Sequence, residues 1–307
     1  MRAAFVSNLI DLARKDESIF LLVGDLGYGL VEPFAQEFPR RFINIGIAEQ
    51  NMTGIATGLA LSGKTVFCYS IANFPTLRCV EHIRNDICSH RASVKIVSGG
   101  TGLIYGALGV THHATDDMAI MRALPNMTVV VPGDPVEAAL ATQAVGRWPG
   151  PCYLRLGRTG DPQVHREKPD FEIGKVIKLR EGRDITLIAS GGVLYNTSQA
   201  AQHLAREGIG SRVLSMPTVK PLDKAAVLSA AAETGTIVTI EEHTIIGGLG
   251  SAVAEVLAEA GFSNIAFKRL GIPDEFCHKV GNQEYLRDLY SLSVEGIAGA
   301  AQSLLRR

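Results

Sequence analysis

Paired cysteines, a charge bias and long apolar runs are all missing from this sequence. It has five cysteines, an odd number, and no two of them form a C-x-x-C pair. Such a set argues against a disulfide framework or a zinc knuckle and favours reduced thiols. We therefore expect a cytoplasmic protein.

The charged residues nearly balance, with 30 lysines and arginines against 31 aspartates and glutamates. This balance gives no support to a general nucleic-acid or membrane-surface binder. The N-terminal segment is apolar in a helical rhythm, but Asp11, Asp16 and Glu17 interrupt it too early for a signal peptide. Since no apolar run elsewhere is long enough to span a bilayer, we expect neither nucleic acid nor membrane as a partner.

Hydrophobic residues make up 46% of the 307 residues, enough for a sizeable core in about two domains. Short β-branched runs alternate with longer amphipathic runs, a pattern typical of α/β domains with mostly parallel sheets flanked by helices. The predicted strands are 20–25, 42–46, 65–70, 94–100, 127–134 and 152–157, then 185–190, 212–216, 236–242 and 265–271. Predicted helices include 48–61, 195–207 and 249–260.

The stretch 159–169 is polar, carries two prolines and lacks a hydrophobic period. We interpret it as a linker between a first domain, 1–160, and a second, smaller α/β domain, 170–307. In open α/β sheets, ligands bind in the crevice outside the carboxyl ends of the strands. That rule directs the search for a site to the loops 24–29, 46–50, 69–74 and 98–113.

Glu49 follows a predicted strand and opens a helix that is otherwise small and apolar. One interpretation is a first-turn carboxylate that the helix dipole favours. However, the helix is too apolar to lie on the surface, so we expect Glu49 to be at least partly buried, with no obvious cation nearby. Burying such a carboxylate is costly and marks it as a functional candidate.

The string IGIAEQNM around Glu49, followed by a Gly/Ala-rich helix, resembles the glutamate motif of thiamine-diphosphate enzymes. The resemblance is nearest to transketolases and deoxyxylulose-phosphate synthases. It continues in order through YSIANF, GVTHH, LPNMTVVVPGDP, YLRLGR, VKPLD and TIEEHTIIGGLGSAVAE, and so covers essentially the whole chain. It implies a pyrimidine-binding domain of the thiamine-diphosphate-binding fold, followed by a transketolase C-terminal domain.

For Glu49 the resemblance implies a hydrogen bond to the cofactor's aminopyrimidine, whose imino tautomer deprotonates the thiazolium carbon. Phe74 matches a position at which relatives stack an aromatic ring on the pyrimidine. Ile71 stands where another aromatic is usual, and Tyr69 is the candidate for the missing ring. The alternative for all three residues is ordinary core packing.

His112 aligns with the histidine of the family's T-H-Q motif, which implies substrate contact and proton transfer. The alternatives are a solvated loop histidine, or a metal site made by His112, His113 and the aspartates that follow. Leu108 and Gly100 stand where many transketolases carry an acid and a second histidine. We therefore expect substrates other than those of the pentose phosphate route.

The segment YLRLGR resembles the one whose arginine grips the substrate phosphate, and Arg158 is the matching residue. The planar guanidinium suits a phosphate group. The alternative is a surface arginine beside the linker. Arg155, inside the strand, is expected to be structural.

The family's magnesium site is not found in this sequence. Relatives hold Mg2+ and the diphosphate with G-D-G and a later pair of asparagines, whereas here the nearest string is Gly24-Asp25-Leu26 and no Asn-Asn pair occurs. The resemblance therefore implies a separate N-terminal transketolase subunit that holds both groups, and no metal ligand in this chain. We expect a shared active site and self-association through the C-terminal half as α2β2. The loop 247–250 is expected to be a structural turn or interface element.

The resemblance thus predicts the C-terminal subunit of a transferase of the EC 2.2.1 type, which moves a two-carbon ketol unit between sugar phosphates. One alternative is the β subunit of a 2-oxoacid dehydrogenase E1 component, over which IGIAEQNM and GVTHH favour a transketolase. The other is an inactive paralogue that only binds or regulates a partner.

Overall fold

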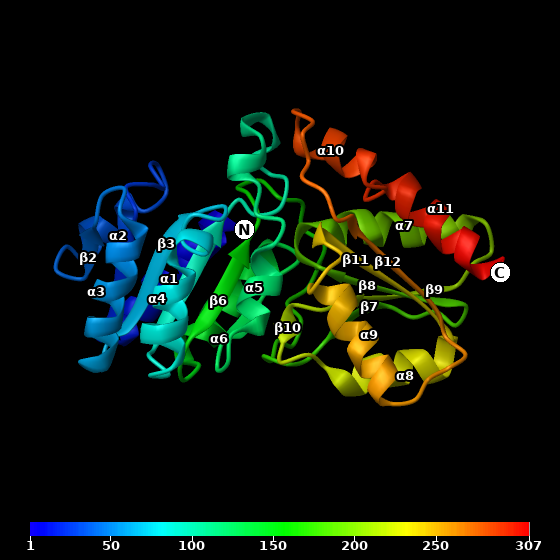
Figure 1. Ribbon diagram of the computed structural model, residues 1–307, viewed down its shortest axis with the longest axis horizontal. Coiled ribbons are helices and arrows are strands. Elements are labelled where there is room, and N and C mark those ends of the chain that lie inside the picture. The colour runs from blue at the N-terminus through cyan, green and yellow to red at the C-terminus, as the bar shows by residue number, and fades with distance from the viewer. Residues whose placement is uncertain (307) are drawn as a thin grey trace.

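The computed structural model describes residues 1–306, which form two open sheets covered by helices (Figure 1). The first sheet has seven strands in the spatial order β10-β5-β6-β4-β3-β1-β2. Along the chain these are β1 (Ile19–Val23), β2 (Phe42–Asn44), β3 (Thr65–Ile71), β4 (Val94–Gly99), β5 (Thr128–Val130), β6 (Cys152–Leu156) and β10 (Thr218–Lys220). All neighbours are parallel except β10 and β5.

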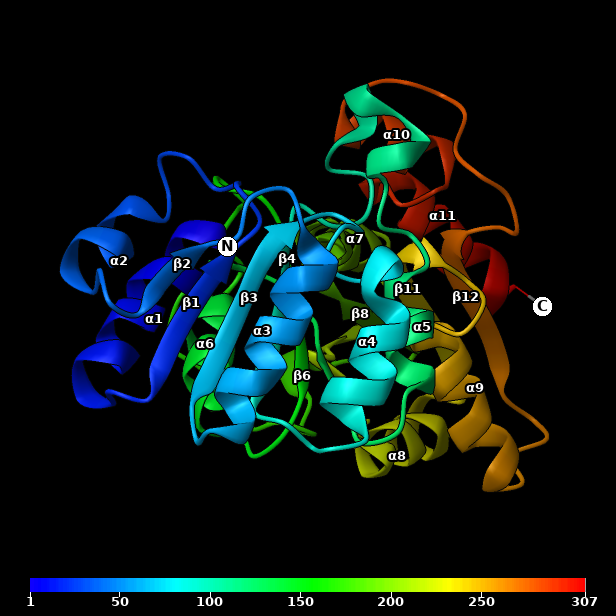
Figure 2. The same cartoon turned by 60° about the vertical axis from the view of Figure 1, so that its left-hand side comes forward.

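Alternation along β3 explains how this sheet is covered. Val66 and Cys68 belong to the apolar cluster under one layer of helices, whereas Phe67 and Tyr69 belong to the cluster on the opposite face. The layer on one face consists of α3 (Glu49–Leu61), α4 (Val80–His82) and α5 (Asp117–Ala123), and the layer on the other consists of α1 (Arg2–Lys15) and α6 (Pro135–Arg147). Figure 2 shows α3 and α4 in front of the sheet. The short α2 (Glu32–Glu37) precedes β2.

The second sheet has five strands in the order β12-β11-β8-β9-β7, all parallel except β7 and β9. They are β7 (Ile177–Arg180), β8 (Ile185–Ser190), β9 (Ser211–Ser215), β11 (Thr236–Thr244) and β12 (Ala266–Ile272). The accompanying helices are α7 (Leu194–Arg206), α8 (Lys224–Thr234), α9 (Leu249–Glu259), α10 (Gln283–Leu289) and α11 (Val294–Leu305). One apolar cluster runs from α3 and β4 to α9, so the two sheets share part of their core.

The predicted α/β fold class is confirmed, and each of the ten predicted strands is present. Two strands were missed, β7 and β10, both short and both antiparallel to their neighbours. β10 lies in the second half of the sequence but pairs with β5 of the first sheet. A strand from 170–307 therefore completes the first sheet and ties the two halves together.

The predicted linker, 159–169, contains no helix or strand but is docked on the first domain. Asp134 Oδ2 accepts the N–H groups of Val164 at 2.8 Å and His165 at 2.9 Å. The buried His165 also places Nε2 2.7 Å from Glu137 Oε1. The segment is a packed connector, because two buried carboxylates of α6 and its N-cap satisfy its polar groups.

The ion pair of His165 predicts a pH-dependent contribution to stability. Burial alone lowers the pKa of His165, but the Glu137 carboxylate raises it, and the net shift is upward. This contribution is therefore complete below the unfolded pKa of about 6.5 and is lost as the pH rises through the folded value. We expect His165→Gln to lower the free energy of unfolding by about 1–3 kcal/mol at pH 6, and by less at pH 9.

Urea unfolding of wild type and variant at both pH values measures this difference. His203→Gln is the matched control, because the His203 side chain is 44% exposed while its Nε2 lies 3.2 Å from Glu207 Oε1. An equal loss at the two pH values for His165→Gln would show that the pair contributes no titrating energy.

Within the described residues, no helix combines the length and the apolar character needed to cross a membrane.

Candidate active site

The carboxyl ends of β1, β2, β3, β4 and β6 meet at one edge of the first sheet, because these strands are parallel. The loops at this edge carry Glu49, Phe74, His112 and Arg158. The loop after β4 rises above the sheet at the top of Figure 1, beside α10 of the second domain.

Glu49 is the first residue of α3 and only 1% exposed, so its predicted burial is confirmed. Its Oε1 accepts a hydrogen bond from Ser70 Oγ at 3.0 Å, and its Oε2 accepts one from Arg78 Nη1 at 3.0 Å. A Cβ on Gly24 would lie 3.3 Å from Oε1, so this glycine lets the backbone after β1 approach the carboxylate. The expectation that no cation lies nearby was wrong, because Arg78 arrives from a turn 29 residues away.

Phe74 links Glu49 to His112. The Arg78 guanidinium lies over the Phe74 ring, 4.4 Å from its centroid, and the His112 ring meets Phe74 edge-on at 5.2 Å. The turn before Phe74 includes Ala72 at a φ of 47°, and the Ala72 carbonyl accepts a hydrogen bond from Ser98 Oγ. The structure thus brings three predicted site residues into one contiguous group.

Tyr69 does not belong to this group. Its ring is fully buried and stacks on Phe5, with centroids 6.0 Å apart, on the α1 face of the sheet. Ser70, the next residue, is the one that faces Glu49, because successive strand residues point to opposite faces. The geometry favours core packing for Tyr69, and we do not include it among the proposed cofactor contacts.

Ile71 ends β3 and is half-buried. Its carbonyl accepts the N–H of Phe74 at 3.0 Å, so it helps form the turn that presents the aromatic ring.

His112 lies in a long loop whose base is closed by an antiparallel bridge. Gly102 and Ala114 exchange hydrogen bonds of 3.0 and 3.1 Å, and His112 is half-buried in the last turn before the bridge. Thr111 Oγ1 lies 3.0 Å from its Nδ1. We call residues 100–116 the histidine loop.

The metal alternative finds no support in this loop. Within residues 1–306, no three or more His, Cys, Asp or Glu side chains gather as a metal site would require. Asp117 Oδ2 is taken up by Tyr153 and by Arg155, the latter at 2.8 Å. His113 is buried, and this burial lowers its pKa. Arg155 is buried as well, which agrees with its expected structural role.

Tyr105 and Arg2 extend the group and were not found from the sequence. A Cβ on Gly100 would lie 2.3 Å from the Tyr105 ring, so Tyr105 fills the space beside the position where relatives carry a histidine. Its ring centroid is 6.3 Å from that of His112, and its hydroxyl accepts a hydrogen bond from Arg2 Nη1 at 3.2 Å. Gly100, which stands where relatives carry a histidine, was the sequence feature that could have indicated another side chain such as Tyr105 in this place. Nothing in the local sequence pattern indicated Arg2.

Arg2 is a partly buried cation without a carboxylate partner among the described residues. The side chain is half-buried, and no carboxylate of the described residues lies within ion-pair distance of it. A guanidinium in this situation can bind an anion from solution with charge-assisted hydrogen bonds.

Arg158 follows β6, beside the root of the histidine loop. Gly100 N–H donates to the Gly157 carbonyl at 3.1 Å, and the Met1 amino group donates to the Arg158 carbonyl at 2.8 Å. The Arg158 side chain is 44% exposed, with Nε 3.8 Å from Asp161 Oδ1. The backbone is therefore held in place, while the guanidinium retains donors for another partner.

Two other places have features of a ligand site. The first, the turn 247–250, is closed by Glu241, whose carboxylate accepts the N–H groups of Leu249 at 2.7 Å and Gly250 at 2.8 Å. These bonds occupy the N–H groups that open α9, so of the two expected roles, a structural turn or an interface element, the geometry supports the structural turn.

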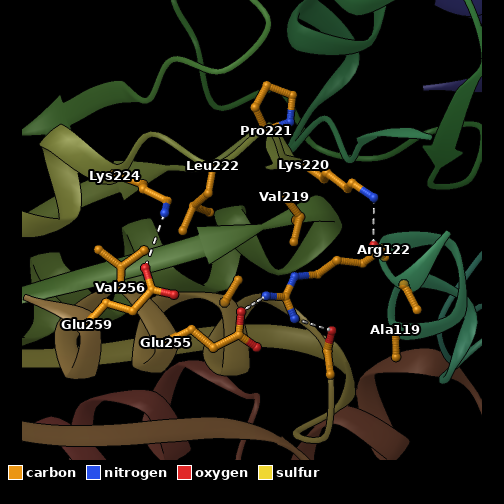
Figure 3. A pocket seen from close by; sticks show the side chains of 13 residues that line it. Ala119, Arg122, Val219, Lys220, Pro221, Leu222, Lys224, Glu255, Val256 and Glu259 are labelled. Atoms are coloured by element: carbon orange, nitrogen blue, oxygen red, sulfur yellow. Dashed lines mark hydrogen bonds and ion pairs between the residues drawn. The ribbon is translucent and has the colours of Figure 1, made fainter. Parts of the chain in front are cut away.

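The second place is a cleft of about 590 Å³ between the domains (Figure 3). Its three cations are already engaged: Arg122 with Glu255 and the Gly247 carbonyl, Lys220 with the carbonyls of Arg122 and Leu124, and Lys224 with Glu259. We assign no function to this cleft.

Comparison with known proteins identifies the class to which this fold and site belong. Residues 1–160 match the model of the transketolase pyrimidine-binding domain, and residues 174–297 match that of the transketolase C-terminal domain. The chain belongs to the transketolase family.

Several relatives match the chain along its whole length. An apulose-4-phosphate transketolase subunit of Phocaeicola vulgatus is 39% identical over 100% of this chain and 97% of that protein. The 6-deoxy-6-sulfo-D-fructose transketolase subunit SqwH of Clostridium sp. is 37% identical over 100% and 95%. A solved structure described as "Split gene transketolase, inactive beta4 tetramer" is 37% identical, with a TM-score of 0.88 over 99% of this chain and 97% of that one.

Longer relatives are matched only in part. The 1-deoxy-D-xylulose-5-phosphate synthase of Heliobacterium modesticaldum is 35% identical over 98% of this chain, which corresponds to 46% of that enzyme.

Proposed function

We propose that this chain is the C-terminal subunit of a split, thiamine-diphosphate-dependent transketolase, which transfers a two-carbon ketol unit between anionic sugars. The observation that carries the proposal is the buried Glu49 carboxylate, joined through Arg78 and Phe74 to His112 at the carboxyl edge of the first sheet. The subunit relatives that match over its full length support the same reaction class.

The residues present fit one end of the cofactor. Glu49 supplies a buried carboxylate beside Gly24, and Phe74 supplies an aromatic face. Arg78 now covers both, but its side chain is 43% exposed and can therefore move into solvent. Glu49 and Phe74 would hold the pyrimidine ring, with Ile71 shaping the turn that carries Phe74. Thiamine diphosphate, when bound, supplies the nucleophilic carbon that carries the two-carbon unit.

Side chains of this chain are the proposed groups for orientation and proton transfer. Ser70 keeps Glu49 Oε1 oriented, which leaves Oε2, the oxygen that now accepts from Arg78, free to share a proton once Arg78 moves away. His112, with its Nδ1 beside Thr111, supplies a ring that can hold or pass a proton at the substrate. These roles need no metal ligand from this chain.

Arg2 and Arg158 are the proposed contacts for the charged end of the substrate. Both lie at the carboxyl edge of the sheet, and both retain donors suited to a phosphate or sulfonate. The named substrates of two relatives, apulose 4-phosphate and 6-deoxy-6-sulfofructose, are anions of these two kinds. With Leu108 exposed and Tyr105 beside Gly100, we propose substrates other than xylulose and ribose phosphates.

A separate N-terminal transketolase subunit is the proposed partner and would hold Mg2+ and the cofactor diphosphate. Ile47, two residues before Glu49, is 81% exposed, and Tyr28, in the loop after β1, is 76% exposed, which is unusual for large hydrophobic residues. We propose that the partner covers them and that two such pairs associate through the C-terminal half as α2β2. The five free, buried cysteines suit a reducing compartment such as the cytoplasm.

Ile47→Asp is expected to weaken the association of the two subunits about 10- to 100-fold, because a buried apolar contact is replaced by a charge. Titration of one purified subunit into the other by calorimetry measures the dissociation constant. Phe262→Asp is the control, since Phe262 is another exposed apolar residue, in the turn between α9 and β12. An unchanged constant for Ile47→Asp would move the partner's surface elsewhere.

Reconstitution tests the function as a whole. The purified chain is mixed with an N-terminal transketolase subunit from the same genome, thiamine diphosphate and magnesium. Ketol transfer is then assayed on apulose 4-phosphate, 6-deoxy-6-sulfofructose, xylulose 5-phosphate and ribose 5-phosphate, with pyruvate included to detect dehydrogenase-type decarboxylation. We expect transfer in the mixture and none from either subunit. Transfer by this chain alone would refute the split site, and a preference for xylulose and ribose phosphates would refute the substrate proposal.

A further inference from the structure

Glu242, on β11 of the second domain, is a buried carboxylate with no part in the site described above. Its Oε1 accepts the backbone N–H of Leu103, in the histidine loop, at 2.7 Å. Gln283 Nε2 donates to both of its oxygens at 2.9 and 3.0 Å, and Arg287 Nε donates to Oε2. One side chain therefore joins the histidine loop to α10 across the boundary between the domains.

The packing around this carboxylate is too close for side chains on the loop. A Cβ on Gly102, which has a φ of 68°, would lie 2.4 Å from Glu242 Oε1. A Cβ on Gly106 would lie 2.3 Å from Leu286 Cδ1 on α10. The backbone of the loop thus rests directly on the second domain, as both Figure 1 and Figure 2 show for the loop and α10.

The other end of the loop is held by the first domain. Asn73, next to Phe74, donates to the His113 carbonyl at 3.1 Å. Arg155 Nη2 donates to the Ala114 carbonyl at 2.7 Å and to the Glu242 carbonyl at 3.1 Å. His112 is therefore carried by a segment that the first domain holds at both ends and that the second domain holds at Leu103.

We propose that Glu242 and Arg287 form a positioning pair that sets the location of His112, so that the second domain contributes to catalysis through the histidine loop. This inference rests on the proposed function of His112. Arg287 is 5% exposed, and its Nε donates to Oε2, so it orients the Glu242 carboxylate. The other oxygen, Oε1, then holds Leu103 near the start of the loop.

The neighbouring Glu241 offers a matched control on the same strand. Glu241 is fully buried and Glu242 is 4% exposed, but their side chains point to opposite faces. Glu241 binds the N–H groups that open α9, whereas Glu242 binds the histidine loop. Substitution of either glutamate should lower the overall stability, whereas only substitution of Glu242 should loosen the histidine loop.

Hydrogen exchange of the purified chain, measured by mass spectrometry, tests whether Glu242 and Arg287 hold the histidine loop, and it requires no enzyme assay. We expect Glu242→Gln and Arg287→Met to raise amide exchange over residues 101–114 at least about tenfold, because local opening of the loop becomes easier. Glu241→Gln should change the start of α9 and leave 101–114 as in the wild type. Unchanged exchange over 101–114 in Glu242→Gln would overturn the proposal.

Kinetics of the reconstituted enzyme test the catalytic consequence, with the best substrate pair from the panel above. A misplaced His112 should raise KM and lower kcat/KM up to about 100-fold in Glu242→Gln, while the thiamine diphosphate requirement stays unchanged. Glu241→Gln should remain near wild type. A looser loop with wild-type kinetics would overturn the positioning role. If the wild-type mixture shows no ketol transfer, the proposed function is refuted, and the positioning role of Glu242 and Arg287 is refuted with it. If only the hydrogen exchange of residues 101–114 is unchanged in Glu242→Gln, the positioning role alone is refuted.

Discussion

Replacing Glu49 by glutamine will lower ketol transfer by the reconstituted enzyme about 100- to 10,000-fold, the range that a positioned acid or base contributes. Glutamine fills the same space and can still accept from Ser70 Oγ, which lies 3.0 Å from Glu49 Oε1. It lacks the carboxylate that can share a proton with the pyrimidine. Steady-state rates at saturating thiamine diphosphate and magnesium measure the loss.

Two controls separate this loss from a folding defect. Glu81→Gln removes an exposed carboxylate from α4 and should leave the rate unchanged. The unfolding transition of Glu49→Gln should remain cooperative, since Arg78 is 43% exposed and can be solvated after losing its partner. A fully active Glu49→Gln mixture would sink the proposed role of this residue.

Replacing Arg158 by methionine should lower kcat/KM about 10- to 100-fold for sugars that carry a phosphate or sulfonate, the range expected when a hydrogen bond to a charged group is lost. Arg158 stands after β6 with its backbone held by the Met1 amino group at 2.8 Å, so the variant should change the side chain alone. Arg2→Met should act in the same direction, because Arg2 has no carboxylate partner in the described part of the chain. Initial rates over a range of each substrate give the constants.

The substrate charge provides the decisive comparison. An acceptor aldehyde without phosphate or sulfonate should react with both variants nearly as with the wild type. Arg166→Met, which removes an exposed arginine from the connector, should leave both kinds of substrate unaffected. Equal losses for charged and uncharged acceptors would assign Arg158 to the structure and not to anion binding.

The parts of this protein that the sequence predicted correctly are those with local signals. Alternating strand and helix patterns predicted the α/β class, and the small, apolar helix after Glu49 predicted the burial of its carboxylate. The ordered motifs of the transketolase family predicted Glu49, Phe74 and His112 as site residues. The structure brings these three residues together through Arg78 and the Phe74 ring. Their catalytic roles remain predictions.

The incorrect or missing predictions concern contacts between distant segments. Tyr69 was a candidate for the pyrimidine platform, but the facing of β3 turns it toward Phe5. Arg78 was not expected beside Glu49, although it is the cation that pairs with it. β10 was missed because a three-residue antiparallel strand carries little periodicity of its own.

By itself, the sequence determined the fold class, the family motifs and the lack of a magnesium–diphosphate motif, since each depends on neighbouring residues or on their spacing. The tertiary structure decided which groups meet: Arg78 with Glu49, Tyr105 with Arg2, and Glu242 with Leu103, 139 residues away. The physical reason is that a local pattern specifies which face a residue takes. The partner on that face depends on how strands and helices from the whole chain pack, and in this protein on a second domain that reaches the loop carrying His112.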